Sequence, residues 1–280
     1  MHAQGWKRAL MGLTAALALG ACEDREVSLQ IVQMEVDGQC LLQSASITGS
    51  TNALGEGAVD LAVTTNYTVY PRVTNNMLDV TTVNGFVDRD GRIDTHDVVL
   101  KEAVISYETE DAALLANIAN PFRQPISGTI PVDGSAVVGL TVLPPKTLEE
   151  LRSSQQFLFF DVNGNVQPVR TSIQILMRIR LEGETLDGTE VKTNEFVFPV
   201  RVCNGCRIVY PPDAIDVSAP VTPNCLRLPT EDTVVTLAED RQVCQSVGTD
   251  NNFIDCRECA GLAVDALSRQ LCQPSVSPAQ

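Results

Sequence analysis

Period-two alternation of apolar and polar residues constrains the fold of this chain more than any other feature of its sequence. The clearest case is Ile173–Leu181, in which Ile173, Ile175, Met177, Ile179 and Leu181 occupy every second position. A second case is Val59–Val73, where the apolar positions predict one buried face and Asp60, Thr64 and Arg72 belong to the other. Since successive strand residues point to opposite faces, both segments are predicted to be half-buried strands.

Turn signals connect these strands to their neighbours. Asp187-Gly188 follows the first strand and predicts a tight hairpin, with a return strand that includes Phe196–Val202. Asn163-Gly164 predicts another turn, and Thr147 with Glu150 forms a capping box that predicts one short helix. Weaker strand patterns cover Val27–Val36, Leu41–Ile47, Val98–Tyr107, Ile126–Val132, Ala136–Leu143 and Phe157–Asp161.

The strands follow one another without regular helices between them, over residues 27–210. This order favours two packed antiparallel sheets over a parallel α/β fold. The chain is therefore predicted to be mainly β, with an antiparallel immunoglobulin-like β-sandwich as its body. The only tryptophan, Trp6, lies near the N-terminus, so the Cys…Trp…Cys pattern of antibody domains is absent.

The composition changes after residue 210. Residues 211–224 contain four prolines and are predicted to be a linker. Residues 225–272 contain five cysteines, and the apolar spacing in Ala260–Leu271 predicts a helix. We expect a small disulfide-stapled module with one helix, because a segment this short cannot build a core without covalent links. Residues 273–280 are predicted to be a disordered tail.

The N-terminus has the form of an export signal. Lys7 and Arg8 precede Ala9–Leu19, an apolar stretch of 11 residues. A membrane-spanning helix needs roughly 20 apolar residues, so this stretch is too short for one. Residues 1–21 are therefore predicted to be a signal peptide.

The end of that stretch, Leu19-Gly20-Ala21-Cys22, resembles the lipobox of bacterial lipoproteins. The resemblance covers the first 22 residues, and it implies that Cys22 receives a diacylglycerol, that the leader is cut before it, and that the new amine is acylated, with palmitate among the expected chains. Residues 22–26 would form a short lipidated tether. The resemblance thus implies a cell-envelope protein attached to a membrane by its N-terminus, and the outer membrane is preferred to the inner one. An ordinary secretory cut after Gly20 is the alternative.

Cysteine parity agrees with this interpretation. If Cys22 carries lipid, the other eight cysteines can form four disulfides, for which 105 pairings exist. These disulfide candidates are Cys40, Cys203, Cys206, Cys225, Cys244, Cys256, Cys259 and Cys272.

Two CxxC motifs, Cys203–Cys206 and Cys256–Cys259, leave three interpretations open. Structural disulfides fit an oxidising compartment. A redox centre would normally open a helix, whereas Cys203 ends a predicted strand. A zinc site would need closer spacing between the two motifs.

Asp88, Asp90 and Asp94 partly match a calcium-binding loop, but Phe86 occupies the first ligand position. A solvated turn in an acidic loop is the alternative, and no metal or other cofactor is predicted. Once the leader is removed, His96 is the only histidine, and no nucleophile or phosphate-loop motif is present. The sequence therefore argues against an enzyme.

The net charge of the chain limits the classes of partner that it can bind. The formal net charge is −15, and the leader contains two bases and no acid. Such a surface repels nucleic acid. We expect a non-enzymatic envelope lipoprotein that binds or scaffolds a protein or a glycan, with loop 81–97 as a contact site. A thiol-disulfide enzyme component using Cys203 and Cys206, and a calcium-dependent adhesion module, are the alternatives.

Overall fold

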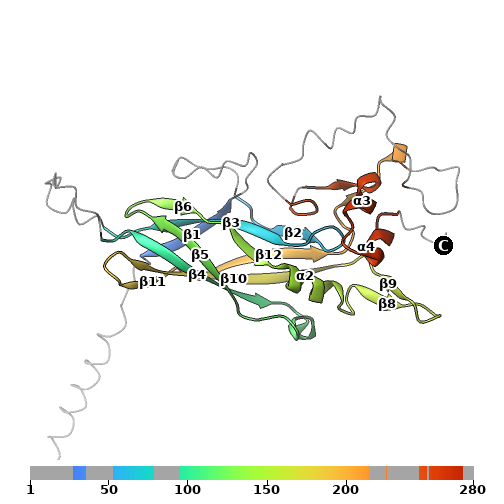
Figure 1. The fold of residues 1–280 in the computed structure, drawn as a ribbon, viewed down its shortest axis with the longest axis horizontal. Coiled ribbons are helices and arrows are strands. Elements are labelled where there is room, and N and C mark those ends of the chain that lie inside the picture. Colours follow the sequence, from blue (N-terminus) through green and yellow to red (C-terminus); the bar gives the residue numbers. More distant parts are fainter. Residues whose placement is uncertain are drawn as a thin grey trace, which may run out of the picture.

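Two β-sheets form most of the part of the chain that the structure describes. The structure is a computed structural model, and it describes residues 28–35, 53–78, 95–214, 225, 246–250 and 252–273. The four-stranded sheet contains β1 (Leu29–Glu35), β3 (Tyr67–Asn75), β6 (Ser135–Val137) and β7 (Leu140–Leu143) (Figure 1). The six-stranded sheet contains β2 (Gly57–Asp60), β12 (Phe196–Cys203), β10 (Ser172–Thr185), β4 (Val98–Glu108), β5 (Phe122–Ile130) and β11 (Glu190–Lys192).

Short elements complete the fold. Two further sheets have two strands each, β8 (Leu158–Phe160) with β9 (Val166–Pro168), and β13 (Ile208–Val209) with β14 (Ile254–Asp255). The helical elements are η1 (Ala112–Leu115), α2 (Pro145–Arg152), η2 (Pro212–Ala214), α3 (Cys256–Leu262) and α4 (Ala266–Gln270). The predicted mainly β fold is confirmed. None of the described helices is both long and apolar enough to span a bilayer.

One hydrophobic core lies between the two large sheets. It is built from the inward-facing side chains of both, including Ile31 and Val73 from the four-stranded sheet and Ile105 and Ile179 from the six-stranded sheet. All four are at most 1% exposed. Burial of alternate side chains along each strand explains why period two in the sequence predicted these elements.

The best-patterned strands agree with their predictions. The Ile173–Leu181 pattern lies in β10, which pairs with β4 and with β12 over most of its length. The predicted turn at Asp187-Gly188 joins β10 to β11, and Gly188 adopts the positive φ of 89° that such a turn requires. β1 lies within the predicted strand Val27–Val36 and has a register shift between Ile31 and Gln33. The predicted strand Leu41–Ile47 lies outside the described residues.

The predicted strand Val59–Val73 is wrong as a single element. The chain leaves β2 at Asp60, turns through residues 61–66 and enters β3 in the other sheet. Asp60 stabilises the turn, because its side chain accepts the N–H of Ala62 and its main-chain carbonyl accepts those of Val63 and Thr64. Asp60 and Thr64, expected on the polar face, are 0% and 1% exposed.

The helix predictions also need correction. The capping box of Thr147 and Glu150 does not form, since α2 begins at Pro145 and Thr147 is a buried residue inside the helix. The C-terminal module contains two described helices rather than one. α3 ends at Leu262. Asp265 then caps the N-terminus of α4, because its side chain accepts the N–H of Ser268 at 2.6 Å.

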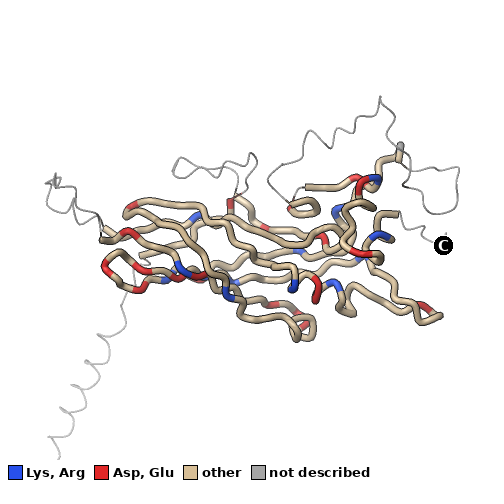
Figure 2. Tube along the Cα trace, in the orientation of Figure 1, with Lys and Arg blue, Asp and Glu red and all other residues tan. Residues whose placement is uncertain are grey.

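The C-terminal segment packs on one end of the six-stranded sheet. Its small core includes Cys225, Ile254 and Leu271, together with Ala62 and Val63 from the turn after β2. We call residues 246–250 and 252–273, together with Cys225, the cap. Acidic residues concentrate at the opposite end, around the β10–β11 turn, where Glu184, Asp187 and Glu190 are close together in the sequence (Figure 2).

Candidate functional site

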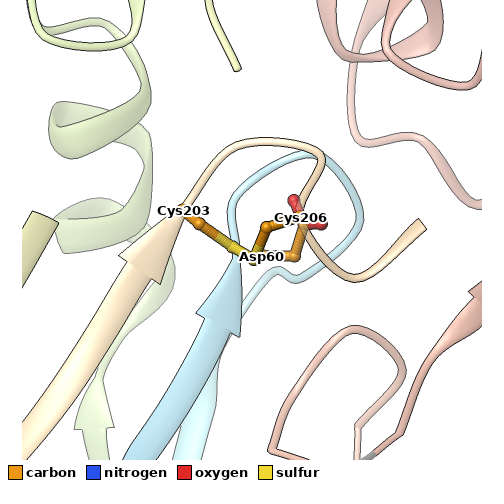
Figure 3. A group of neighbouring side chains, drawn as sticks. All are labelled: Asp60, Cys203 and Cys206. Atoms are coloured by element: carbon orange, nitrogen blue, oxygen red, sulfur yellow. A yellow bond between two sulfur atoms is a disulfide. The ribbon is translucent and has the colours of Figure 1, made fainter. Parts of the chain in front are cut away.

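Two adjacent parallel strands bring an acid and a cysteine pair together. β12 pairs with β2 so that Cys203 lies opposite Asp60, the last residue of each strand. The Cys203–Cys206 disulfide closes the turn that leaves β12, and the Asp60 side chain lies directly beside it (Figure 3). The Asp60 carboxylate and both sulfur atoms lie within 4.8 Å of one another.

Asp60 is the centre of a buried hydrogen-bond network. Its Oδ1 accepts the N–H groups of Ala62 at 2.9 Å and Gly205 at 2.7 Å, and its Oδ2 accepts the N–H of Arg207 at 2.8 Å. Gly205 has a φ of 78°, a backbone conformation that glycine adopts without strain and that turns its N–H toward the carboxylate. One side chain therefore links the turn after β2 to the turn after β12.

Burial is the main influence on the charge of this group. Removal from water raises the pKa of Asp60, and the N–H donors of Arg207, Gly205 and Ala62 oppose that rise. Burial also disfavours the charged form of Arg207 and so lowers the pKa of its guanidinium, and the nearby charge of Asp250 opposes part of that fall. The Arg207 side chain also stacks over Phe253, 4.9 Å from the ring centroid, so its charge is held at the rim of the cap.

A second buried acid ties the cap to both large sheets. Asp250 is 8% exposed, and its Oδ1 accepts the hydroxyl of Tyr67 at 2.7 Å and the N–H of Ala58 at 3.0 Å. Burial raises the pKa of Asp250, and burial together with the neighbouring Asp250 raises the pKa of Tyr67 well above its usual range. Tyr67 and Asp250 are 183 residues apart in sequence. Asp250 thus holds the cap against the sheet end, while Asp60 joins the turns after β2 and β12 within the body.

The donor set does not fit a zinc ion while the cysteines are oxidised. Zinc is bound by thiolates, and Cys203 and Cys206 share a disulfide. A second cluster, Cys225, Asp255 and Cys256, has the same limitation, because Cys225 and Cys256 are bonded to each other. Asp255 is already occupied, since it accepts the N–H and the guanidinium of Arg257.

The described cysteines form three disulfides. These are Cys203–Cys206, Cys225–Cys256 and Cys259–Cys272. The second CxxC motif is therefore not a redox pair, because its two cysteines bond to different partners. Cys22, Cys40 and Cys244 lie outside the described residues, so their predicted roles stay predictions.

Chemistry at the first CxxC is restricted to one sulfur. Cys203 is fully buried, whereas Cys206 is exposed. An incoming thiolate would therefore attack the sulfur of Cys206 and release that of Cys203 beside Asp60. The pair ends a strand, as the sequence indicated, and does not open a helix.

The calcium hypothesis concerns residues that the structure does not describe. Asp88, Asp90 and Asp94 are among them, and so is most of the predicted contact loop 81–97. Of the adjoining residues that are described, Asp97 accepts the N–H of Val132 at 2.9 Å, and Nδ1 of His96 lies 2.9 Å from the carbonyl oxygen of Leu78. The calcium interpretation stays a prediction, which melting with and without EDTA would test.

Asp60, Tyr67 and Asp250 were not identified from the sequence as parts of one site. The available signal for Asp60 was its place as the only charged residue in the apolar run Ala58–Val63. No local signal joins it to Asp250, which the sequence places in a polar loop. Comparisons with known proteins give no further guide: no family model matches this chain, and no curated protein matches it.

Proposed function

We propose that this chain is a non-enzymatic lipoprotein of the bacterial cell envelope, which serves as a membrane-anchored binding or structural module. Its body would be an immunoglobulin-like β-sandwich, and the outer membrane is the proposed location. A protein or a glycan of the envelope is the proposed partner. The observation that carries the proposal is the sequence Leu19-Gly20-Ala21-Cys22 at the end of an apolar stretch that follows Lys7 and Arg8.

The described structure supports this proposal in two ways. Cysteines paired as disulfides fit an exported protein, since such bonds persist in oxidising compartments. The buried acids Asp60 and Asp250 are occupied by structural hydrogen bonds: Asp60 joins two turns of the body, and Asp250 joins the cap to the body.

Metabolic labelling with an alkyne analogue of palmitate tests the anchor. We expect the wild-type protein to be labelled and to fractionate with membranes, because two or three acyl chains give stable attachment where one does not. Cys22→Ser should be unlabelled. Ala21→Ser is the matched control, since it keeps a small residue before the cysteine and should be labelled as the wild type is. An unlabelled wild type, or label retained in Cys22→Ser, would overturn the proposal.

A thiol-disulfide exchange function is the second candidate, favoured by the exposure of Cys206 and by the position of Asp60. In that reaction a partner thiolate would form a mixed disulfide with Cys206, and Cys203 would leave as a thiolate beside Asp60. Mild reduction of the native protein, followed by thiol capping and mass measurement, decides between the two. Rapid capping of this pair alone would favour exchange, and a pair reduced only after unfolding would favour a structural bond.

A further inference from the structure

A cavity of about 440 Å³ lies where the body meets the cap. That volume is within the range of sites that hold small ligands or a few side chains. Its walls come from the turn after β2, from α2, from the β8–β9 hairpin and from α4. The apolar walls include Pro145, Leu158, Pro168, Val264 and Leu267.

The polar residues of the cavity favour a ligand with neutral or positive charge. Asn204 is 2% exposed and lines the cavity, and among the described residues its Oδ1 has no hydrogen-bond partner. Arg152 is already engaged, because it donates to the carbonyl oxygens of Leu61 at 2.8 Å and Thr64 at 3.3 Å. Arg152 also pairs with Asp265 at 3.9 Å, so Glu149, Asp265 and Arg152 together leave one net negative charge at the cavity.

The β8–β9 hairpin extends the apolar wall outward from the cavity. Leu158 lies opposite Pro168 and Phe160 lies opposite Val166, and directly opposed pairs two residues apart share one face of a hairpin. The face that lines the cavity therefore continues to Phe160, which is 69% exposed. Val162 beyond it is fully exposed, and Phe159 on the other face is 49% exposed.

This strip is unusually free of charge for an acidic protein. Asp161 is the only charged residue from Phe157 to Val169 (Figure 2). Its carboxylate is directed into the hairpin turn, where it accepts the N–H groups of Asn163 and Asn165 at 2.8 Å each. Contiguous exposed apolar residues of this kind typically mark a binding surface.

The strip lies far from the proposed membrane anchor. β1 begins beside Thr193, at the end of the body that carries β11, whereas the hairpin and cap lie at the other end (Figure 1). The 14 residues of β10 alone span about 45 Å. Cys22 precedes Leu29 by seven residues, which reach about 25 Å at most. The hairpin therefore lies at the end of the body remote from the proposed anchor.

We propose that the cavity and the hairpin face form a binding site for an extended peptide segment of another protein, with aliphatic side chains at alternate positions and basic or neutral residues between them. The site deepens the proposed function and rests on it. Alternate residues of an extended peptide are about 6.6 Å apart, which matches the spacing of the Leu158 and Phe160 positions.

A peptide fits these groups better than other ligands. A basic side chain complements the net negative charge that Glu149, Asp265 and Arg152 leave at the cavity. Each strand of the hairpin also has one edge that pairs with no other described strand, and peptides commonly add to such edges.

Tryptophan fluorescence offers a direct test, because the only tryptophan, Trp6, is lost with the leader. Displayed eight-residue random peptides would first be selected on the full-length acylated protein with its disulfides intact. We expect the selected peptides to share alternate aliphatic residues with lysine or arginine between them. They should shift the emission of Phe160→Trp to shorter wavelength and leave Val197→Trp unchanged, since Val197 is also exposed, at 44%, but lies at the start of β12, away from the cavity.

Two further variants test the chemistry. Phe160→Ser should weaken peptide binding at least tenfold, whereas Val197→Ser should change it less than twofold. Glu149→Lys should weaken binding of basic peptides severalfold. No consensus, acidic peptides, or equal binding to both serine variants would overturn the site. So would an emission shift of Phe160→Trp on neutral phosphatidylcholine vesicles without peptide, which would indicate membrane contact instead.

The proposed function can fail separately from this site. Peptide binding by a protein without acyl chains at Cys22 would remove the lipoprotein proposal and leave the site intact. Acylation at Cys22 without peptide binding would remove the site alone.

Discussion

Replacement of Asp60 by alanine should destabilise this protein more than most single substitutions. The change removes the acceptor of three main-chain N–H groups, from Ala62, Gly205 and Arg207. The first two of these hydrogen bonds are buried and the third is partly buried. An unsatisfied buried donor costs about 1–3 kcal/mol, so we expect a loss of about 3–5 kcal/mol in the free energy of unfolding.

Urea denaturation with intact disulfides measures this effect. With a denaturant slope of about 2–3 kcal/mol per molar, the midpoint should fall by about 1–2 M. Asp60→Asn should be intermediate, because its amide oxygen can keep the bonds of Ala62 and Gly205 while its NH₂ group faces the N–H of Arg207.

Asp161→Ala is the matched control. Asp161 accepts the N–H groups of Asn163 and Asn165 in an exposed turn, where water can replace the carboxylate. Its midpoint should stay close to that of the wild type. If Asp60→Ala shifts the midpoint no more than Asp161→Ala does, then the hydrogen bonds of Asp60 to the turns after β2 and β12 do not stabilise the fold.

Two other predictions concern the same region. Removal of each disulfide by paired serine substitution should lower the urea midpoint, and the loss should be larger for a longer sequence separation. The separations are 31 residues for Cys225–Cys256, 13 for Cys259–Cys272 and 3 for Cys203–Cys206. Loop entropy predicts losses of about 4, 3 and 2 kcal/mol in the free energy of unfolding, and the reverse order would contradict this reasoning. Burial raises the pKa of Asp60 and of Asp250 above 3.8, so the folded state takes up their protons at higher pH than the unfolded chain does. Their contribution to stability should therefore increase as the pH falls toward 3.8 and be lost as the pH rises through the raised pKa values. The free energy of unfolding of the wild type, minus that of Asp250→Asn, should therefore rise as the pH falls. A fall in this difference would show that the hydrogen-bond donors outweigh burial.

Local patterns predicted those elements whose burial is itself local. The alternation in Ile173–Leu181 predicted β10, because a strand with one buried face must place apolar residues at every second position. Asp187-Gly188 predicted its turn for a similarly local reason, since few residues adopt positive φ without strain. The cysteine-rich C-terminal composition likewise predicted disulfides.

Other features depend on contacts between distant segments. Nothing within Val59–Val73 distinguishes one long strand from two strands in different sheets, since both bury the same apolar residues. The difference lies in Asp60, whose burial becomes favourable only when Gly205 and Arg207, about 145 residues later, supply N–H donors. An acid at that position without those donors belongs on a polar face, as the pattern predicted.

The sequence by itself determined that this chain is mainly β, where its clearest strands lie and that its C-terminal part is rich in disulfides. Only the tertiary structure decided which sheet each strand joins, how the described cysteines pair, and that Asp60, Tyr67 and Asp250 meet at one end of the body. The physical reason is that alternation and turn chemistry act over a few residues, whereas desolvation and hydrogen bonding of a buried acid depend on whatever the rest of the chain brings to it.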